Sequence, residues 1–98
     1  MATYILLSHF SDQGIRNVMD TTKRADAVRQ VAQTVGASVT EIYWTLGRFD
    51  VVAIVEAPDT KAVTAFGLSL GRLGNVRTET LPAFTKAEME NILSNVVA

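Results

Sequence analysis

Val51-Val52-Ala53-Ile54-Val55 is a run of five consecutive apolar residues, four of them β-branched. A short run of this composition is typical of a β-strand. Because successive side chains of a strand point to opposite faces of its sheet, this strand is apolar on both faces. We therefore predict a central strand from Val51 to Glu56 that is covered on both sides.

A second strand precedes this one and is joined to it by a tight turn. Val39 to Leu46 has a strand-like composition, and Gly47-Arg48-Phe49-Asp50 is all that separates the two segments. A crossover between parallel strands needs about a dozen residues or more. The two strands are therefore expected to form an antiparallel hairpin.

Two more strands are expected nearer the ends of the chain. Thr3 to Phe10 is rich in aliphatic, aromatic and β-branched side chains, and it stops at the turn formers Ser11-Asp12-Gln13-Gly14. Val76 to Leu81 has a similar composition and is expected to end at Pro82.

The first expected helix follows a polar stretch from Asp12 to Asp20, which is interpreted as a solvated loop. Thr21 or Thr22 can cap this helix, and Gly36 is expected to end it. Its apolar residues recur at helical spacing, at Ala25, Val28, Val31, Ala32 and Val35.

Two further helices are expected in the second half of the chain. Asp59 is a suitable N-cap for the first of them, and Gly74-Asn75 ends it. Its apolar face comprises Ala62, Val63, Phe66, Leu70 and Leu73. Thr85-Lys86-Ala87-Glu88 has the spacing of a capping box, which predicts a short last helix with apolar residues at Met89, Ile92, Leu93 and Val96.

The order β-α-β-β-α-β plus a C-terminal helix predicts one α+β domain over residues 1–98 with a ferredoxin-like fold. In this fold both main helices lie on one face of a four-stranded antiparallel sheet, and the other face is bare. Burial of a few hundred Å² of apolar surface, at roughly 25 cal/mol per Å², is worth several kcal/mol. We therefore expect a second copy of the chain to cover the bare face, giving a homodimer or a higher homo-oligomer.

Composition excludes several classes of partner and site. Nine basic and ten acidic residues give a net charge of −1, and the basic residues form no stripe, so nucleic acid is not expected as a partner. Charged residues interrupt every apolar stretch long enough to cross a bilayer, so no membrane span is expected. The chain has no cysteine and a single histidine, so no metal site is expected, and the missing cysteine suits the cytoplasm.

Three segments resemble the GYD domain family, namely Met1-Ala2-Thr3-Tyr4-Ile5, Thr45 to Pro58 and Leu73-Gly74-Asn75-Val76-Arg77-Thr78. The similarity spans nearly the whole chain. GYD proteins belong with the dimeric α/β-barrel proteins, so the resemblance implies a ferredoxin-like subunit whose sheet packs against the sheet of another subunit. It implies no particular reaction or cofactor.

The glycine, aromatic residue and aspartate that name this family are matched by Gly47, Phe49 and Asp50, with Arg48 between them. The aromatic residue is usually tyrosine in the family, and here the phenol hydroxyl is missing. A catalytic role for that hydroxyl therefore does not carry over to this chain.

His9 and Asp50 are the candidate catalytic residues. His9 has the side chain that titrates near neutral pH, so it can serve as a general base or as a ligand donor. A strand-end imidazole bonded to a neighbouring loop is the structural alternative. Asp50 can pair with Arg48 or Arg77 to anchor a carboxylate, or it can cap its turn by accepting backbone amides, which the sequence favours.

The candidate ligand-binding residues are Tyr43, Trp44, Arg48, Phe49 and Arg77. Tyr43 and Trp44 are neighbours on one strand, so they point to opposite faces, and only one of them can face the helices. The other lies on the dimer side or in a pocket. Both can equally serve core and interface packing, which is the favoured interpretation.

Gly67 and Gly71 are spaced four apart on a helix, which predicts a close helix approach and a cavity beneath that helix.

Two functions are compatible with these features. The favoured one is a binding or assembly module that is not an enzyme, with a cavity between sheet and helices for a small apolar or aromatic molecule. The alternative is a cofactor-independent oxygenase or isomerase acting on an aromatic or apolar substrate, or a haem-binding protein, and it depends on analogy with other dimeric α/β-barrel families. A haem-binding version requires His9 to face an open cavity.

Overall fold

The computed structural model describes residues 1–97, and its elements follow the expected order. They are β1 (Ala2–Phe10), α1 (Asp12–Arg16), η1 (Val18–Asp20), α2 (Thr21–Thr34), β2 (Ser38–Trp44), β3 (Val51–Ala57), α3 (Thr60–Leu73), β4 (Val76–Ala83) and α4 (Lys86–Leu93). The ferredoxin-like α+β fold predicted from the sequence is confirmed. No helix within residues 1–97 has the length and apolar character needed to cross a membrane.

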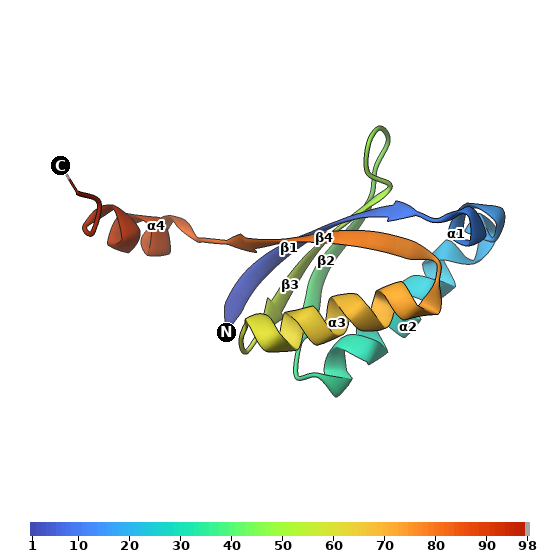
Figure 1. Ribbon diagram of the computed structural model, residues 1–98, viewed down its shortest axis with the longest axis horizontal. Coiled ribbons are helices and arrows are strands. Elements are labelled where there is room, and N and C mark those ends of the chain that lie inside the picture. Colours follow the sequence, from blue (N-terminus) through green and yellow to red (C-terminus); the bar gives the residue numbers. More distant parts are fainter. Residues whose placement is uncertain (98) are drawn as a thin grey trace.

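The sheet has the strand order β2-β3-β1-β4, and every pair of neighbours is antiparallel. The apolar segment that begins at Val51 is thus a central strand, as predicted, because β3 lies between β2 and β1. Helices α2 and α3 lie side by side on one face of the sheet (Figure 1). The other face carries no helix from residues 1–97.

The strand register assigns each side chain to one of these two faces. Leu6 pairs with Ala53 and Tyr4 with Val55, and these residues face the helices. The buried core on that side consists of Tyr4, Leu6, Ala32, Ala37, Val39, Val55, Ala57, Val63, Phe66 and Leu70. On the bare face, Ile5 lies between Ile54 of β3 and Leu81 of β4, and Leu7 pairs with Val52.

The ends of α3 are fixed by the expected residues. The Asp59 carboxylate accepts a hydrogen bond from the backbone amide of Ala62 at 2.9 Å, which caps the start of the helix. Gly74 ends it in the left-handed conformation with φ of 85°, a conformation that favours glycine.

The polar stretch after β1 is helical, so its interpretation as a loop was wrong. Ser11 caps α1 by accepting a hydrogen bond from the Gly14 amide at 3.0 Å, and η1 follows directly. Helix α2 begins at Thr21 with Asp20 at its N-cap position, so neither Thr21 nor Thr22 is the cap. The hydroxyl of Thr21 is used elsewhere, because it accepts a hydrogen bond from Trp44.

Two strand ends also differ from their predicted positions. β4 continues through Pro82 to Ala83, which is possible because β4 is an edge strand and one side of it needs no amide donors. β2 stops at Trp44, two residues before the predicted end at Leu46, and the Leu46 side chain is fully exposed in the turn.

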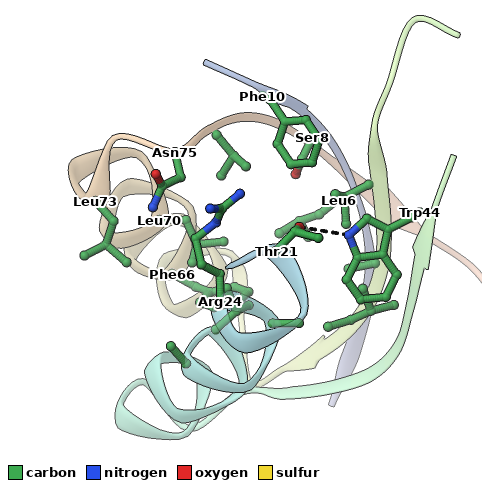
Figure 2. A pocket seen from close by; sticks show the side chains of 17 residues that line it. Leu6, Ser8, Phe10, Thr21, Arg24, Trp44, Phe66, Leu70, Leu73 and Asn75 are labelled. Atoms are coloured by element: carbon green, nitrogen blue, oxygen red, sulfur yellow. Dashed lines mark hydrogen bonds between the residues drawn. The ribbon is translucent and has the colours of Figure 1, made fainter. Parts of the chain in front are cut away.

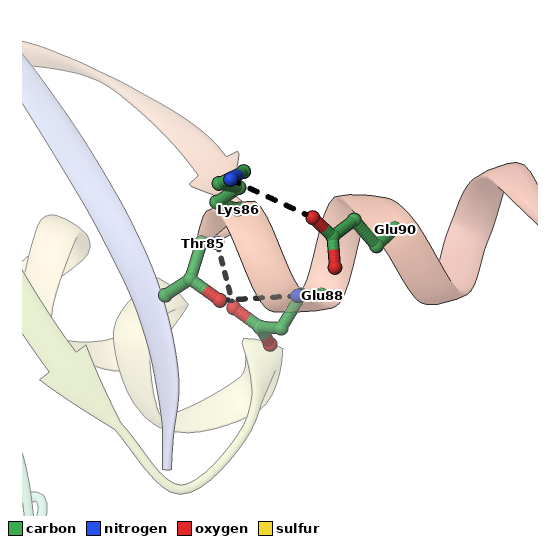
Figure 3. Close-up of polar contacts among 4 residues, drawn as sticks. All are labelled: Thr85, Lys86, Glu88 and Glu90. Carbon is green, nitrogen blue, oxygen red and sulfur yellow. Dashed lines mark hydrogen bonds and ion pairs between the residues drawn. The ribbon is translucent and has the colours of Figure 1, made fainter.

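The last helix, α4, stands away from the body of the domain at the end of β4 (Figure 1). Its capping box is present, since the Thr85 hydroxyl accepts from the Glu88 amide at 3.2 Å and the Glu88 carboxylate accepts from the Thr85 amide at 2.9 Å (Figure 3). An exposed ion pair at 3.8 Å joins Lys86 to Glu90 on the next turn. Helix α4 therefore forms locally, and it leaves the bare sheet face uncovered.

Candidate functional site

A cavity of about 320 Å³ lies between the sheet and the two main helices (Figure 2). Its lining is mostly apolar, and it draws on all four strands or their ends. The sheet side consists of Leu6, Ser8, Phe10, Ile42, Trp44, Val51, Ala53, Asn75 and Val76. The helix side consists of Thr21, Arg24, Ala25, Ala27, Val28, Phe66, Leu70 and Leu73.

Trp44 forms one wall of this cavity. Its indole Nε1 donates a hydrogen bond of 3.0 Å to the Thr21 hydroxyl at the start of α2, so the ring bridges the space between β2 and α2 (Figure 2). Leu6 and Phe66 lie deeper and are almost fully buried. The arrangement is a flat aromatic wall facing a rigid apolar floor, which suits a small apolar molecule.

Arg24 enters the cavity from α2. Its Nη1 donates to the carbonyl oxygen of Asn17 at 2.6 Å, and its Nη2 donates to the carbonyl oxygen of Gly14 at 3.3 Å. The guanidinium carbon lies 5.9 Å from the centre of the Phe10 ring, within range of a cation–π contact. These contacts fix the position of a half-buried cation beside an otherwise apolar space.

The segment around α1 is fastened to the turn between α3 and β4. The Ser11 hydroxyl donates to the carbonyl oxygen of Gly74, and the Ser11 amide donates to the carbonyl oxygen of Asn75 at 3.0 Å. The Gln13 side chain adds a hydrogen bond of 3.1 Å to the Leu73 carbonyl oxygen. Because Asn75 and Phe10 both line the cavity, this junction fixes one end of the site.

Trp44 is the one candidate site residue from the sequence that lines the cavity. Tyr43 points to the bare face, where it is 53% exposed and its hydroxyl donates to Glu41 at 3.3 Å. His9 and Arg77 are paired across β1 and β4 on that same bare face, and His9 is exposed. The structure therefore separates Trp44 from Tyr43, His9 and Arg77 by the thickness of the sheet.

Asp50 fastens the hairpin turn to β1. Its Oδ2 accepts a hydrogen bond from the Phe10 amide at 2.8 Å, and its own amide donates to the Ser8 carbonyl oxygen at 2.8 Å. Within residues 1–97 its carboxylate makes no ion pair with Arg48 or Arg77, so the hypothesis of an Asp–Arg anchor is not supported. Arg48 instead lies over the ring of Phe49, 5.3 Å from its centre, outside the cavity.

We expect Asp50→Ala to lower the free energy of unfolding by about 1–3 kcal/mol, because the half-buried end of β1 loses a charged acceptor for the Phe10 amide. Asp50→Asn keeps an acceptor oxygen and is expected to lose less than half as much. Urea denaturation of the two variants beside the wild type measures the difference. Equal stability of all three proteins would contradict this structural role.

Several cavity residues were not identified from the sequence, notably Ser8, Arg24 and Asn75. Arg24 carried a usable signal, since Thr21, Arg24 and Val28 recur at the spacing of one helix face. Ser8 and Asn75 have no such signal, because their positions depend on how the helices cross the sheet.

Gly67 and Gly71 were expected to leave a cavity beneath α3, and the structure shows where they lie. Gly67 lies above β4, and a Cβ atom added there would sit 3.7 Å from the Thr78 hydroxyl, an ordinary contact. Gly67 and Gly71 border a second depression along β4 and do not line the main cavity. The two glycines therefore do not account for the main cavity.

The described residues contain no group of three His, Asp or Glu side chains that could hold a metal ion.

The chain is similar to known proteins of one family over most of its length. The model of the GYD domain family matches residues 4–93. The glutamine synthetase and cystathionine beta-lyase binding protein of Thermus thermophilus is 34% identical over 90 residues, which cover 91% of this chain and 95% of that protein. A crystal structure from the same organism superposes with a TM-score of 0.55 and 26% identity, covering 87% of this chain and 95% of that chain.

Proposed function

This chain belongs to the GYD domain family, and from that membership and its cavity we propose that it is a binding module that forms a homodimer and holds a small apolar or aromatic molecule. The observation that carries the proposal is the cavity itself. Its volume of about 320 Å³ lies at the lower end of the range of small-ligand sites. Its lining is mostly aliphatic and aromatic with few polar groups, which is typical of small-ligand sites.

The lining of the cavity favours binding over acid–base catalysis. None of the described residues that line it is a histidine, aspartate, glutamate or lysine. A general base or an imidazole ligand for haem is therefore missing from the space where a substrate or a haem would lie. The two candidate catalytic residues, His9 and Asp50, lie outside the cavity, and this argues against the enzymatic alternative.

Assembly is the second part of the proposal. On the bare face, Ile5, Leu7, Val52 and Ile54 form an apolar strip across the two central strands. On this face Glu41 of β2 and Glu79 and Arg77 of β4 lie at the two edges of the strip. A two-fold axis brings such an apolar strip onto its own copy, so we propose a second copy as the occupant.

Helix α4 supports the same assembly. Its apolar residues Met89, Ile92 and Leu93 are exposed, and so is Val96 just beyond the helix. A helix that projects beyond its own sheet is well placed to extend onto a second subunit. The Thermus thermophilus relative is named for binding two enzymes, so a heterologous protein is the competing occupant of these surfaces.

We place the dimer in the cytoplasm, because the absence of cysteine suits a reducing compartment.

Filling the cavity tests the proposed ligand site. Ala53 lies on the sheet wall of the cavity, and we expect Ala53→Phe to weaken binding of 1-naphthylmethanol at least about tenfold by occupying its space. Ala25→Phe fills the cavity from α2 and provides a second blocking variant. Calorimetry measures binding, and the fluorescence of Trp44, the one tryptophan of the chain, reports it independently.

Leu68→Phe is the matched control, since Leu68 is exposed on α3 and lies outside the main cavity. It should bind the probe as the wild type does. The proposal fails if the wild type binds neither this alcohol nor the carboxylate with the same rings, or if both blocked variants are folded and bind as tightly as the wild type.

A further inference from the structure

Arg24 is the one charged side chain among the described residues that line the cavity. Figure 2 shows its guanidinium inside the ring of lining residues, between Asn75 and Thr21 and below Phe10. A cation in this position determines which ligands the apolar space accepts, because neutral and cationic molecules leave its charge unmatched.

The charge of Arg24 has no acidic partner within residues 1–97, where the ion pair is that of Lys86 and Glu90 on α4. The two carbonyl oxygens of Asn17 and Gly14 accept hydrogen bonds from its two terminal nitrogens and hold the side chain in place. They do not neutralise it. A planar guanidinium that is fixed in this way and lacks a carboxylate is prepared for an anion.

A second polar side chain, Ser8, also lines the cavity. Ser8 is 7% exposed, and its backbone carbonyl accepts a hydrogen bond from the Asp50 amide. A hydroxyl both donates and accepts, so Ser8 can bond a ligand oxygen. The remaining walls are aliphatic and aromatic, which requires the rest of the ligand to be apolar.

We propose that the cavity binds a small organic carboxylate with an apolar body, whose carboxylate group pairs with Arg24 and whose body lies against Trp44 and Phe66. This inference rests on the proposed function, since it names the class of ligand for the same cavity. The carboxylate matches the fork of N–H donors on a guanidinium, and the volume of about 320 Å³ limits the body to one or two rings or a short chain.

A matched pair of probes tests the ligand class. 1-Naphthoate and 1-naphthylmethanol share the same rings and differ in charge, and calorimetry gives the affinity of each. We expect the wild type to bind the carboxylate about tenfold to a hundredfold more tightly, the range for hydrogen bonds to a charged group. Arg24→Gln should lose this preference and keep its affinity for the alcohol within about twofold, because the apolar walls are unchanged.

Lys23→Gln removes the same charge from the neighbouring, exposed position and should behave as the wild type. Arg24→Lys keeps a cation without the planar fork and should retain part of the preference. If Arg24→Gln loses both probes through damage to the fold, the preference of Arg24→Lys for the carboxylate tests the ligand class instead.

Equal affinity of the wild type for the two probes, or a preference that survives in Arg24→Gln, overturns the ligand class while leaving the cavity as a binding site. Binding of neither probe to the wild type overturns the proposed function as well.

Discussion

Ile54→Lys is expected to convert the protein from a dimer to a monomer, with at least about a 100-fold weaker association. Ile54 lies in the middle of the bare face, between Ile5 of β1 and Glu41 of β2. In a single chain its side chain is already half-buried by its neighbours, so the variant chain still folds. In a sheet-to-sheet dimer the new ammonium would be buried at the centre of the interface, where its loss of hydration costs more than the neighbouring Glu41 carboxylate offsets. Sedimentation equilibrium at micromolar concentration measures the change.

Leu68→Lys is the control for this experiment. It introduces the same charge at an exposed leucine on the helix side of the domain, and it should leave the dimer intact. A wild type that is monomeric at the same concentration would contradict self-assembly and favour a heterologous protein on the bare face. A dimer that persists in Ile54→Lys would place the interface elsewhere.

Gly14→Ala is expected to lower the free energy of unfolding by about 3 kcal/mol, near the upper end of the cost of overpacking. Gly14 is buried, and a Cβ atom added to it would lie 1.9 Å from the carbonyl oxygen of Asn75. That oxygen belongs to the backbone and also accepts a hydrogen bond from the Ser11 amide, so it has no room to move. In a domain of this size the midpoint of thermal unfolding should fall by more than about 10 °C.

Gly71→Ala makes the same chemical change where space is open. Nothing lies within 4 Å of a Cβ atom built on Gly71, and the residue is inside α3. Its substitution should raise stability by about 0.5–1 kcal/mol, because alanine favours the helix more than glycine does. Circular dichroism melts of both variants provide the comparison. If Gly14→Ala melts with the wild type, the junction between α1 and the turn before β4 is looser than the structure shows.

Most of the fold could be predicted from local pattern. The five apolar residues from Val51 determine a central strand, and the turn that precedes them is too short for anything but a hairpin. Asp59 and Gly74 mark the ends of α3 because each satisfies a backbone requirement that depends only on neighbouring residues. These features need no knowledge of the tertiary structure.

The errors occurred where distant segments decide the local structure. The segment from Asp12 to Asp20 is polar and resembles a loop, but its first helix is held by Ser11, whose side chain also bonds the turn at Gly74. β4 passes through Pro82 because it is an edge strand, which the strand order determines and the local sequence does not.

The candidate site was predictable only in part for the same reason. The alternation of strand side chains requires Tyr43 and Trp44 to face opposite sides, and Trp44 lines the cavity. Because of the family motif around Asp50, site residues were expected at the hairpin turn. In the structure Asp50 accepts a hydrogen bond from the backbone of β1 instead. Helical spacing places Arg24 on the same face of α2 as Thr21 and Val28, but the strand residues that it meets depend on the angle at which α2 crosses the sheet.

Native mass spectrometry of the wild-type protein, purified from its own host without added ligand, tests the ligand and the dimer together. We expect a complex of two chains that carries the extra mass of a small organic acid, and we expect Ala53→Phe to give the two-chain complex without that mass. A spectrum of single chains of unmodified mass, recorded under conditions that preserve a known weak dimer, would contradict both.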